Sequence, residues 1–416
     1  MNKSPSLKKI PERLNDIAEL PKFIQEHNIK LFPKEEMSIL DLINYYIETN
    51  KTDEAFFIVD LGSAIEQYKA WKQLYPRIQP YYSVRCCPDN MIIRLLFLLG
   101  CGFSCASKQE IISVNSIENC SERIIYSNPV KDPQFMKYAR SQDVDLMSFD
   151  SETELYKIKL YHPYAKLLIH ISTSHLFEGG SENKKFGCNL EIAKSLLEQC
   201  KFLELNVYGV SFNAGKKLAD PSVYEGAIKA AREVFNIAKE VGIEMKCLNI
   251  GDGFCGGAGS NKVKIEETAK RINESLDKYF GDIEDLKIIA EPGRFLVESS
   301  HTLVFNVIGK KKIDNGKETM FSYYMNEGIY GCFNCIMFDD AKPEIAPFSE
   351  RNEKTYKSLI FGPTCDSIDT IARDIYLPEL VVGEWCYVEH FGAFTRASAS
   401  TFNGFQKTPA SYVILY

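Results

Sequence analysis

The stretch that decides the fold runs from residue 207 to residue 253 and reads VYGVSFNAGKKLADPSVYEGAIKAAREVFNIAKEVGIEMKCLNIGDG. Its two ends, VYGVSFNAG and MKCLNIGDG, are short β-rich apolar runs, and each closes in glycine and small polar residues. The middle, from Ser222 to Gly242, has apolar residues at helical spacing and a glycine at its end. A strand, a helix and a second strand in this order predict one parallel βαβ unit.

The same alternation continues on both sides of this unit, from about residue 55 to residue 295. Further β-rich runs, interleaved with segments of helical period, are AFFIVDLG (55–62), PYYSVRC (80–86), GFSCAS (102–107), RIIYSNP (123–129), LMSFD (146–150), KLLIHIS (166–172) and KIIAEPGR (287–294). So many units over roughly 240 residues fit a (β/α)8 barrel, an α/β fold that keeps its active site just after the strand ends. We therefore expect a TIM-like barrel at residues 55–296.

The pattern changes after Leu296. Runs such as HTLVFNVIGKKKI (301–313), EWCYVEHFGAFT (384–395) and SYVILY (411–416) look like strands joined by turns, with few long helical repeats. We expect a C-terminal all-β domain that the first residues of the chain join. Residues 1–54 plus 297–416 would then form the second domain.

Composition limits the class of protein. Of the 416 residues, 45% are apolar and 25% are charged, which is the balance of a soluble globular protein. Because 49 basic and 56 acidic residues give a net charge of -7, we expect neither nucleic acid nor an anionic membrane as a partner. The 13 cysteines, an odd number with a vicinal pair at Cys86 and Cys87, do not fit a disulfide framework. With neither a signal nor a membrane-spanning pattern in the sequence, we expect a cytoplasmic protein.

Two short motifs at strand ends are candidates for chemistry. GDGFCG (251–256) matches G-x-G-x-x-G, but the loop continues as GAGSN instead of opening a helix at once. We interpret it as the phosphate loop of a barrel or as a tight turn. The acid and the arginine of EPGR (291–294) could face one ligand or form a structural ion pair. The C-x-x-C motif CFNC (332–335) has no second pair at zinc spacing, so we predict packing residues and no metal.

The chain also contains, in this order, the motifs YYSVRC, FSCASKQEI, IIYSNP, KKFG, GVSFNAG, IGDGF, AEPGR, YGCFNCIMFD, GPTCDSID and FGAFT, then STFNGF. Their order and spacing resemble those of eukaryotic ornithine decarboxylase and its relatives, from about residue 55 to the end. The resemblance implies an alanine racemase-like architecture, in which a barrel binds pyridoxal phosphate beside a β-domain. It also implies putrescine formation in polyamine metabolism, by a head-to-tail homodimer with active sites at the interface.

The resemblance assigns roles to residues that this chain retains. Glu291 would bind the pyridine nitrogen of the cofactor, where a carboxylate keeps that nitrogen protonated. Gly253 and Arg294 would receive the cofactor phosphate, and Cys365 would be the proton donor after carbon dioxide leaves. The remaining assignments are substrate binding (Asp339 and Asp366) and the dimer interface (Lys185, Asp369 and Phe402).

The departures from the family pattern decide the function. Arg85 stands where the family has the lysine that binds the cofactor as an imine, and a protonated, delocalised guanidinium is a poor imine former. Asp252 replaces a glycine of the phosphate loop, where its carboxylate would repel the phosphate. The other replacements in the cofactor pocket are Ser104 for an aspartate, His170 for an arginine, Asn213 for a histidine, Lys216 for a serine and Phe394 for a tyrosine. Together they favour lost or severely reduced catalysis, and cofactor binding that is doubtful and not covalent.

Two classes of function remain open. The first is a pseudoenzyme that acts by binding, as the antizyme inhibitors of the family do, or as the regulatory partner of an active paralogue. The second is an active pyridoxal phosphate-dependent ornithine or arginine decarboxylase, which the retained residues support. Antizyme recognition in the family uses a surface near residues 131–159, where Lys131, Lys137 and Arg140 are mixed with acidic residues. We also expect Lys216 and Asp252 to pair within the phosphate pocket, with Arg294 able to approach Asp252.

Overall fold

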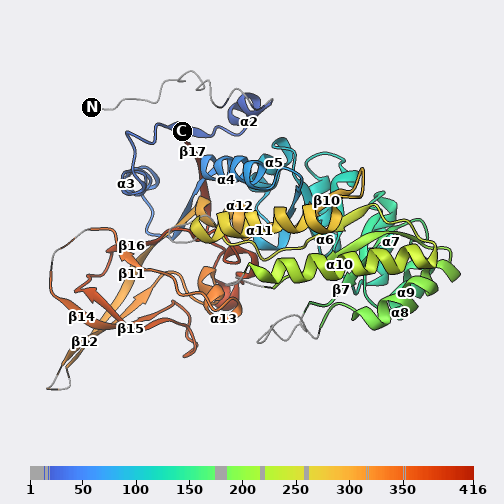
Figure 1. Cartoon of the computed structure of the whole chain (residues 1–416). Coiled ribbons are helices and arrows are strands. Elements are labelled where there is room, and N and C mark those ends of the chain that lie inside the picture. Colours follow the sequence, from blue (N-terminus) through green and yellow to red (C-terminus); the bar gives the residue numbers. More distant parts are fainter. Residues whose placement is uncertain are drawn as a thin grey trace. The chain divides into compact units, whose positions relative to one another are not determined.

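The structure, a computed structural model, describes residues 14, 17, 19–173, 185–215, 221–256, 262–314, 316, 318–349, 351 and 353–416. The chain divides into two compact units, which are residues 67–296 and residues 1–66 with 297–416. Figure 1 shows the course of the chain through both units.

The unit of residues 67–296 contains a closed barrel of eight parallel strands, in the order β10-β3-β4-β5-β6-β7-β8-β9. The strands are β3 (Gln79–Ser83), β4 (Gly102–Cys105), β5 (Ile124–Tyr126), β6 (Leu146–Phe149), β7 (Lys166–Ile171), β8 (Asn206–Phe212), β9 (Cys247–Asn249) and β10 (Lys287–Ala290). The helices that alternate with them are α5 (Asn90–Leu98), α6 (Lys108–Asn115), α7 (Pro133–Ser141), α8 (Glu152–Tyr161), α9 (Leu190–Phe202), α10 (Ser222–Val241) and α11 (Lys262–Phe280). The predicted (β/α)8 barrel is thereby confirmed.

Local sequence explains the form of these elements. The helix α5 begins after Asp89, whose side chain accepts hydrogen bonds from two backbone amides of the first turn. The long helix α10 ends at Gly242, which adopts the left-handed conformation (φ 84°) that closes many helices. Figure 1 shows α10 and α11 side by side on the barrel. Buried side chains from the strands pack together inside, namely Tyr81, Ile125, Leu146, Leu168, Cys247 and Ile289.

The other unit is built on a nine-stranded sheet with the order β1-β17-β2-β11-β12-β14-β15, from which β16 and β13 branch off at β11. Its strands are β1 (Lys30–Phe32), β2 (Phe56–Asp60), β11 (His301–Asp314), β12 (Thr319–Met325), β13 (Ala346–Pro347), β14 (Thr355–Phe361), β15 (Thr370–Pro378), β16 (Trp385–Val388) and β17 (Ala410–Leu415). Its described helices include α2 (Leu20–Glu26), α3 (Ile39–Asn50) and α13 (Cys335–Phe338). The predicted second domain, rich in strands, is present.

One predicted barrel strand belongs to this sheet. The run AFFIVDLG forms β2, which pairs antiparallel with β11 and parallel with β17 and is not part of the barrel. The prediction that the barrel begins at residue 55 is therefore wrong, and the first barrel strand is β3. A buried apolar strand followed by the helix α4 (Leu61–Leu74) has the local pattern of a βα unit. Its true partners lie far along the chain, where no local pattern reveals them.

All 13 cysteines lie in the described part of the chain, and none of them is joined in a disulfide. Twelve of them are buried or half-buried, and Cys365 is exposed. Among the described residues, none of the helices is both long and apolar enough to cross a membrane.

Candidate functional site

The candidate site lies at the carboxyl ends of the barrel strands, where this fold holds its active sites. Arg85 follows β3 in the single turn Val84–Cys86. Ser104 lies near the end of β4, and Glu291 directly follows β10. Because β3 pairs with both β4 and β10, these residues leave the barrel at neighbouring positions. Asp252 joins them from the loop after β9, the other neighbour of β10.

The guanidinium of Arg85 contacts two carboxylates. Its Nη2 donates a hydrogen bond to Asp252 Oδ2 at 2.6 Å, and its Nη1 lies 3.8 Å from Glu291 Oε2. Nη1 also donates to Ser104 Oγ at 3.2 Å. Burial lowers the pKa of Arg85, but the charges of Asp252 and Glu291 raise it by more, so the pKa lies above its ordinary value. Arg85 is therefore a permanent cation and cannot act as a nucleophilic amine.

Glu291 is held in place by neutral donors. Its side chain is buried, Oε1 accepts a hydrogen bond from Asn249 Nδ2 at 2.6 Å, and Oε2 accepts one from Ser104 Oγ at 2.5 Å. The Ser104 hydroxyl is in turn 2.7 Å from Ser127 Oγ. The amide of Asn249 can face Glu291 only with its NH2 group, because its Oδ1 accepts from the backbone N of Gly251 at 2.9 Å. The carboxylate position is thus set by the barrel itself.

Two residues of this network, Asn249 and Ser127, were not predicted. A signal for both is present in the sequence, because each is a polar residue at the carboxyl end of a strand. Asn249 is the last residue of β9, and Ser127 directly follows β5. Polar residues at the carboxyl end of every barrel strand are therefore candidates for this site.

The loop after β9 requires glycine at two positions. Gly251 (φ 71°) and Gly253 (φ 103°) both have positive φ, which side chains disfavour. A Cβ atom on Gly253 would lie 2.3 Å from the backbone oxygen of Gly215, so this loop touches the loop after β8. The phenol of Tyr224 donates to the backbone oxygen of Asp252 at 3.3 Å. These contacts fix the backbone that carries the Asp252 carboxylate.

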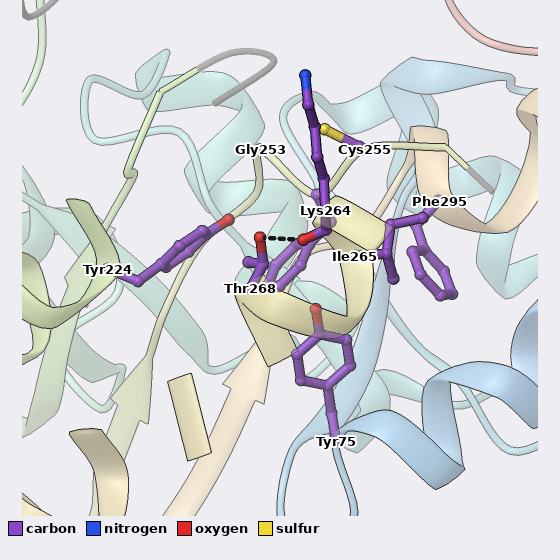
Figure 2. Close-up of a pocket in the computed structure, with 9 residues that line it drawn as sticks. Tyr75, Tyr224, Gly253, Cys255, Lys264, Ile265, Thr268 and Phe295 are labelled. Carbon is purple, nitrogen blue, oxygen red and sulfur yellow. Dashed lines mark hydrogen bonds between the residues drawn. The ribbon is translucent and has the colours of Figure 1, made fainter. Parts of the chain in front are cut away.

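A small pocket borders the same loop, and Figure 2 shows the residues that line it. The ring of Phe254 packs against the rings of Tyr75 and Tyr224, with centroids 5.4 and 5.5 Å away. In the first turns of α11, the Thr268 hydroxyl donates to the backbone oxygen of Lys264 at 2.7 Å. These aromatic contacts anchor the loop from the side of the helices.

Two other predicted replacements lie on adjacent strands. His170 in β7 has Nδ1 3.0 Å from Ser211 Oγ, and burial lowers the pKa of His170 to about 4, so its ring is neutral near pH 7. Asn213 follows β8, where its Oδ1 accepts from the backbone N of Gly215 at 2.9 Å and its backbone oxygen accepts from Thr173 Oγ1 at 2.7 Å. Neither residue supplies a positive charge to the site.

The predicted pair of Lys216 and Asp252 lies outside the described residues, because Lys216 does. A partner of Asp252 that the structure describes is Arg85, which the sequence did not suggest. Arg294 begins the short helix α12 (Arg294–Val297), directly after the EPGR motif. Lys185 lies before α9, and its amine is 5.1 Å from the centre of the Phe186 ring.

The remaining predicted residues belong to the unit of the nine-stranded sheet. Asp339 is nearly buried at the end of α13. Cys365 and Asp366 lie between β14 and β15, where Cys365 Sγ is 3.4 Å from Asn403 Oδ1 and Asp366 Oδ2 accepts from the hydroxyl of Tyr330 at 2.5 Å. In this loop Cys365 is therefore exposed, whereas the carboxylate of Asp366 is fixed by the hydroxyl of Tyr330.

Asp369 and Phe402 have different surroundings within that unit. Asp369 is buried, and its carboxylate accepts from the backbone N of Ile329 at 2.9 Å and from Thr364 N and Oγ1 at 3.1 and 2.7 Å. The half-exposed ring of Phe402 stacks on Tyr330 with centroids 4.3 Å apart. Phe394, in place of the family tyrosine, has a positive φ of 57°. The predicted roles of Asp369 and Phe402 at an interface stay predictions.

Comparison with known proteins gives consistent matches over most of the chain. The model of a family described as "pyridoxal-dependent decarboxylase, pyridoxal binding domain" matches residues 61–298. Ornithine decarboxylase of Mus musculus is 42% identical over 388 residues, which cover 90% of this chain and 84% of that protein. Antizyme inhibitor 2 of Xenopus laevis is 40% identical over 405 residues, which cover 94% of this chain and 88% of that protein.

Solved structures agree with this similarity. The arginine decarboxylase of Paramecium bursaria Chlorella virus has a TM-score of 0.85 and 30% identity, with 90% of this chain and 100% of that chain covered. The lysine/ornithine decarboxylase of Vibrio vulnificus has a TM-score of 0.81 and 29% identity, with 91% and 99% covered. The chain is thus similar both to decarboxylases of basic amino acids and to an antizyme inhibitor.

Proposed function

Because the chain belongs to the family of pyridoxal-dependent decarboxylases, we propose that it is an ornithine decarboxylase-like protein of polyamine metabolism that has lost catalysis and acts by binding another protein. The observation that carries this proposal is the hydrogen bond of 2.6 Å between Arg85 and Asp252. Both residues stand at positions to which the family resemblance assigns cofactor binding. Here they bind each other.

The residues of the site fit the pyridine nitrogen of pyridoxal phosphate but not its aldehyde or its phosphate. Glu291, oriented by Asn249 and Ser104, is suited to a protonated pyridine nitrogen. Arg85 cannot replace an amine that must lose its proton to attack the cofactor aldehyde. The carboxylate of Asp252 sits in the loop that would hold the phosphate, where like charges repel by several kcal/mol. The residues of this site therefore do not support catalysis through this cofactor.

A surface for antizyme is proposed on the helices α7 and α8, where the resemblance places it. Lys137 and Arg140 are exposed on α7, with their cationic groups 4.9 Å from the ring centre of Tyr161 and 5.7 Å from that of Tyr164. Lys131 does not belong to this surface, because it is buried and its amine is 2.8 Å from the carboxylate of Glu154. The exposed positive charge of the segment therefore comes from Lys137 and Arg140 on α7, together with Lys159 on α8.

Assembly with a second chain is part of the same proposal, either as a homodimer or as a heterodimer with an active paralogue. The loop of Cys365 and Asp366 and the residues Lys185, Asp369 and Phe402 are retained although Arg85 has replaced the lysine. A cytoplasmic location is proposed from the described cysteines, which form no disulfide. Sedimentation at micromolar concentration should give a dimer, and a monomer that captures no paralogue would contradict this part of the proposal.

The alternative function is an active ornithine or arginine decarboxylase that binds the cofactor without an imine to residue 85. It is favoured by the buried, oriented carboxylate of Glu291. A decarboxylation assay separates the two functions. We expect no release of carbon dioxide from labelled ornithine or arginine above background with added cofactor, and release that depends on the cofactor would establish the alternative.

Partner binding needs its own measurement. Purified antizyme should be captured by the chain, and the double variant Lys137→Glu/Arg140→Glu should lose at least tenfold in affinity. The matched control is Lys270→Glu, which changes an exposed lysine on α11 and should bind as the unmodified chain does. Equal affinity of all three proteins would refute the surface on α7, and no capture at all would remove antizyme as the partner.

A further inference from the structure

The acceptors around Arg85 form a site of their own, which we call the guanidinium site and define as Ser104, Asp252 and Glu291. Its oxygens lie 3.2, 2.6 and 3.8 Å from the nearest guanidinium nitrogen of Arg85. Two carboxylates and one hydroxyl thus surround a single planar cation. A guanidinium, which presents several N–H donors in one plane, is the cation best matched to such a set of oxygens.

Other groups than Arg85 position the carboxylate of Glu291 and the backbone that carries Asp252. Glu291 is fixed by Asn249, whose amide is oriented by a backbone N–H, and by the hydroxyl of Ser104. Asp252 is carried by a loop with positive φ at both flanking glycines, and Tyr224 donates to its backbone oxygen. The barrel therefore holds Glu291 and the Asp252 backbone in place, and the guanidinium of Arg85 binds between the two carboxylates.

We propose that this end of the barrel is a binding site for a guanidinium ion, with the chain's own Arg85 as the resident ligand, and that Asp252 makes the glycine loop select a cation and exclude phosphate. The proposal rests on the proposed function only for the loss of catalysis. It goes further by naming the chemical class that the altered site accepts. The carboxylate of Asp252 supplies the selectivity, since a neutral residue at this position would leave backbone N–H groups and Arg85 to attract an anion.

The first test removes the resident ligand and supplies it from solution. In the variant Arg85→Ala, 20 mM guanidinium chloride should raise the thermal midpoint relative to 20 mM sodium chloride. A dissociation constant of about 10 mM would increase the folding equilibrium constant about threefold at this concentration. The unmodified chain should show no such increase, because Arg85 already fills the site.

The control for this test is the double variant Arg85→Ala/Asp252→Asn, which lacks one carboxylate of the site. It also measures the weak denaturing effect of guanidinium. We expect guanidinium not to stabilise the double variant. We also expect tetramethylammonium, which has no N–H donors, not to stabilise Arg85→Ala. Absence of a guanidinium response in Arg85→Ala, or an equal response in the double variant, would overturn the proposal.

The second test concerns phosphate. Inorganic phosphate at 10 mM should not change the thermal midpoint of the unmodified chain when compared with chloride at equal ionic strength. In Asp252→Gly, where Arg85 loses its nearest carboxylate, phosphate should raise the midpoint. Stabilisation of the unmodified chain by phosphate, or none in Asp252→Gly, would refute the selectivity assigned to Asp252. Neither test measures enzymatic activity. Finding that the chain is an active enzyme would therefore contradict the proposed function without deciding whether the site binds guanidinium or excludes phosphate.

Discussion

A double-mutant cycle on Arg85 and Asp252 tests how much their contact stabilises the barrel. Arg85→Met removes the positive charge, Asp252→Asn removes the negative charge, and the double variant removes both. The two side chains are 31% and 24% exposed, so the contact lies between a surface ion pair, worth about 0.2–1 kcal/mol, and a fully buried one, where loss of a partner costs about 3–5 kcal/mol. After allowance for solvent screening we expect a coupling free energy of about 1–2 kcal/mol.

Urea unfolding followed by tryptophan fluorescence measures these free energies. The chain has two tryptophans, and Trp71 is buried in the barrel unit against Phe254 and Phe295. A Trp385→Phe background removes the signal of the other unit, so the remaining fluorescence reports the barrel. Each single change should lower the unfolding midpoint, and the double variant should be less destabilised than the sum of the two.

The matched control for this cycle is the pair of Lys270 and Glu274 on α11. Their charged groups are 3.9 Å apart, and their side chains are 77% and 58% exposed, so their coupling should stay below about 0.5 kcal/mol. A coupling between Arg85 and Asp252 no larger than this control would refute the argument that the guanidinium is bound in the site.

Three further changes test other parts of the structure. Glu154→Gln should cost about 3–5 kcal/mol of stability, because it leaves the amine of Lys131 buried without a counter-charge, and calorimetry showing a loss below about 1 kcal/mol would contradict this. Burial raises the pKa of Asp60 in the folded chain to about 6, above its ordinary value. The folded chain therefore binds this proton more tightly than the unfolded chain, and the stability that results is present at low pH and is lost as the pH rises through 6. The difference in thermal midpoint between Asp60→Asn and the unmodified chain should therefore grow in favour of the variant from pH 4 to pH 7, and a constant difference would disprove the assignment. Gly316→Ala, at a position with positive φ but open space, should cost about 1 kcal/mol, and Gly253→Ala should cost about 1–3 kcal/mol more because of the close backbone contact; equal costs would argue against that contact.

The barrel could be predicted from sequence because its elements are local. Runs such as KLLIHIS and KIIAEPGR begin and end with clear signals, and the helices between them keep their apolar period. The strand β2 was misplaced because its own sequence is compatible with either sheet. Only its pairing with β11 and β17 decides its place, and that pairing joins distant parts of the chain.

The sequence predicted most residues of the candidate site but not the contacts between them. Arg85, Asp252 and Glu291 were singled out by their types and motifs, and the structure brings them together. The contact between Arg85 and Asp252 was missed, because a motif states which residue replaces which and not where a long side chain extends. Asn249 was missed although its place at a strand end is visible in the sequence, because an amide alone suggests no chemistry until the acid beside it is known.

The central proposal is that residue 85 of this chain does not bind pyridoxal phosphate covalently and that the site does not retain the cofactor. The most direct measurement is an absorbance titration of the purified chain with pyridoxal phosphate, followed by borohydride reduction and mass analysis. We predict the spectrum of the free aldehyde, with no saturable band and no reduced adduct at one cofactor per chain. A saturable imine band, fixed by borohydride at one site in the barrel and displaced by inorganic phosphate, would contradict the account.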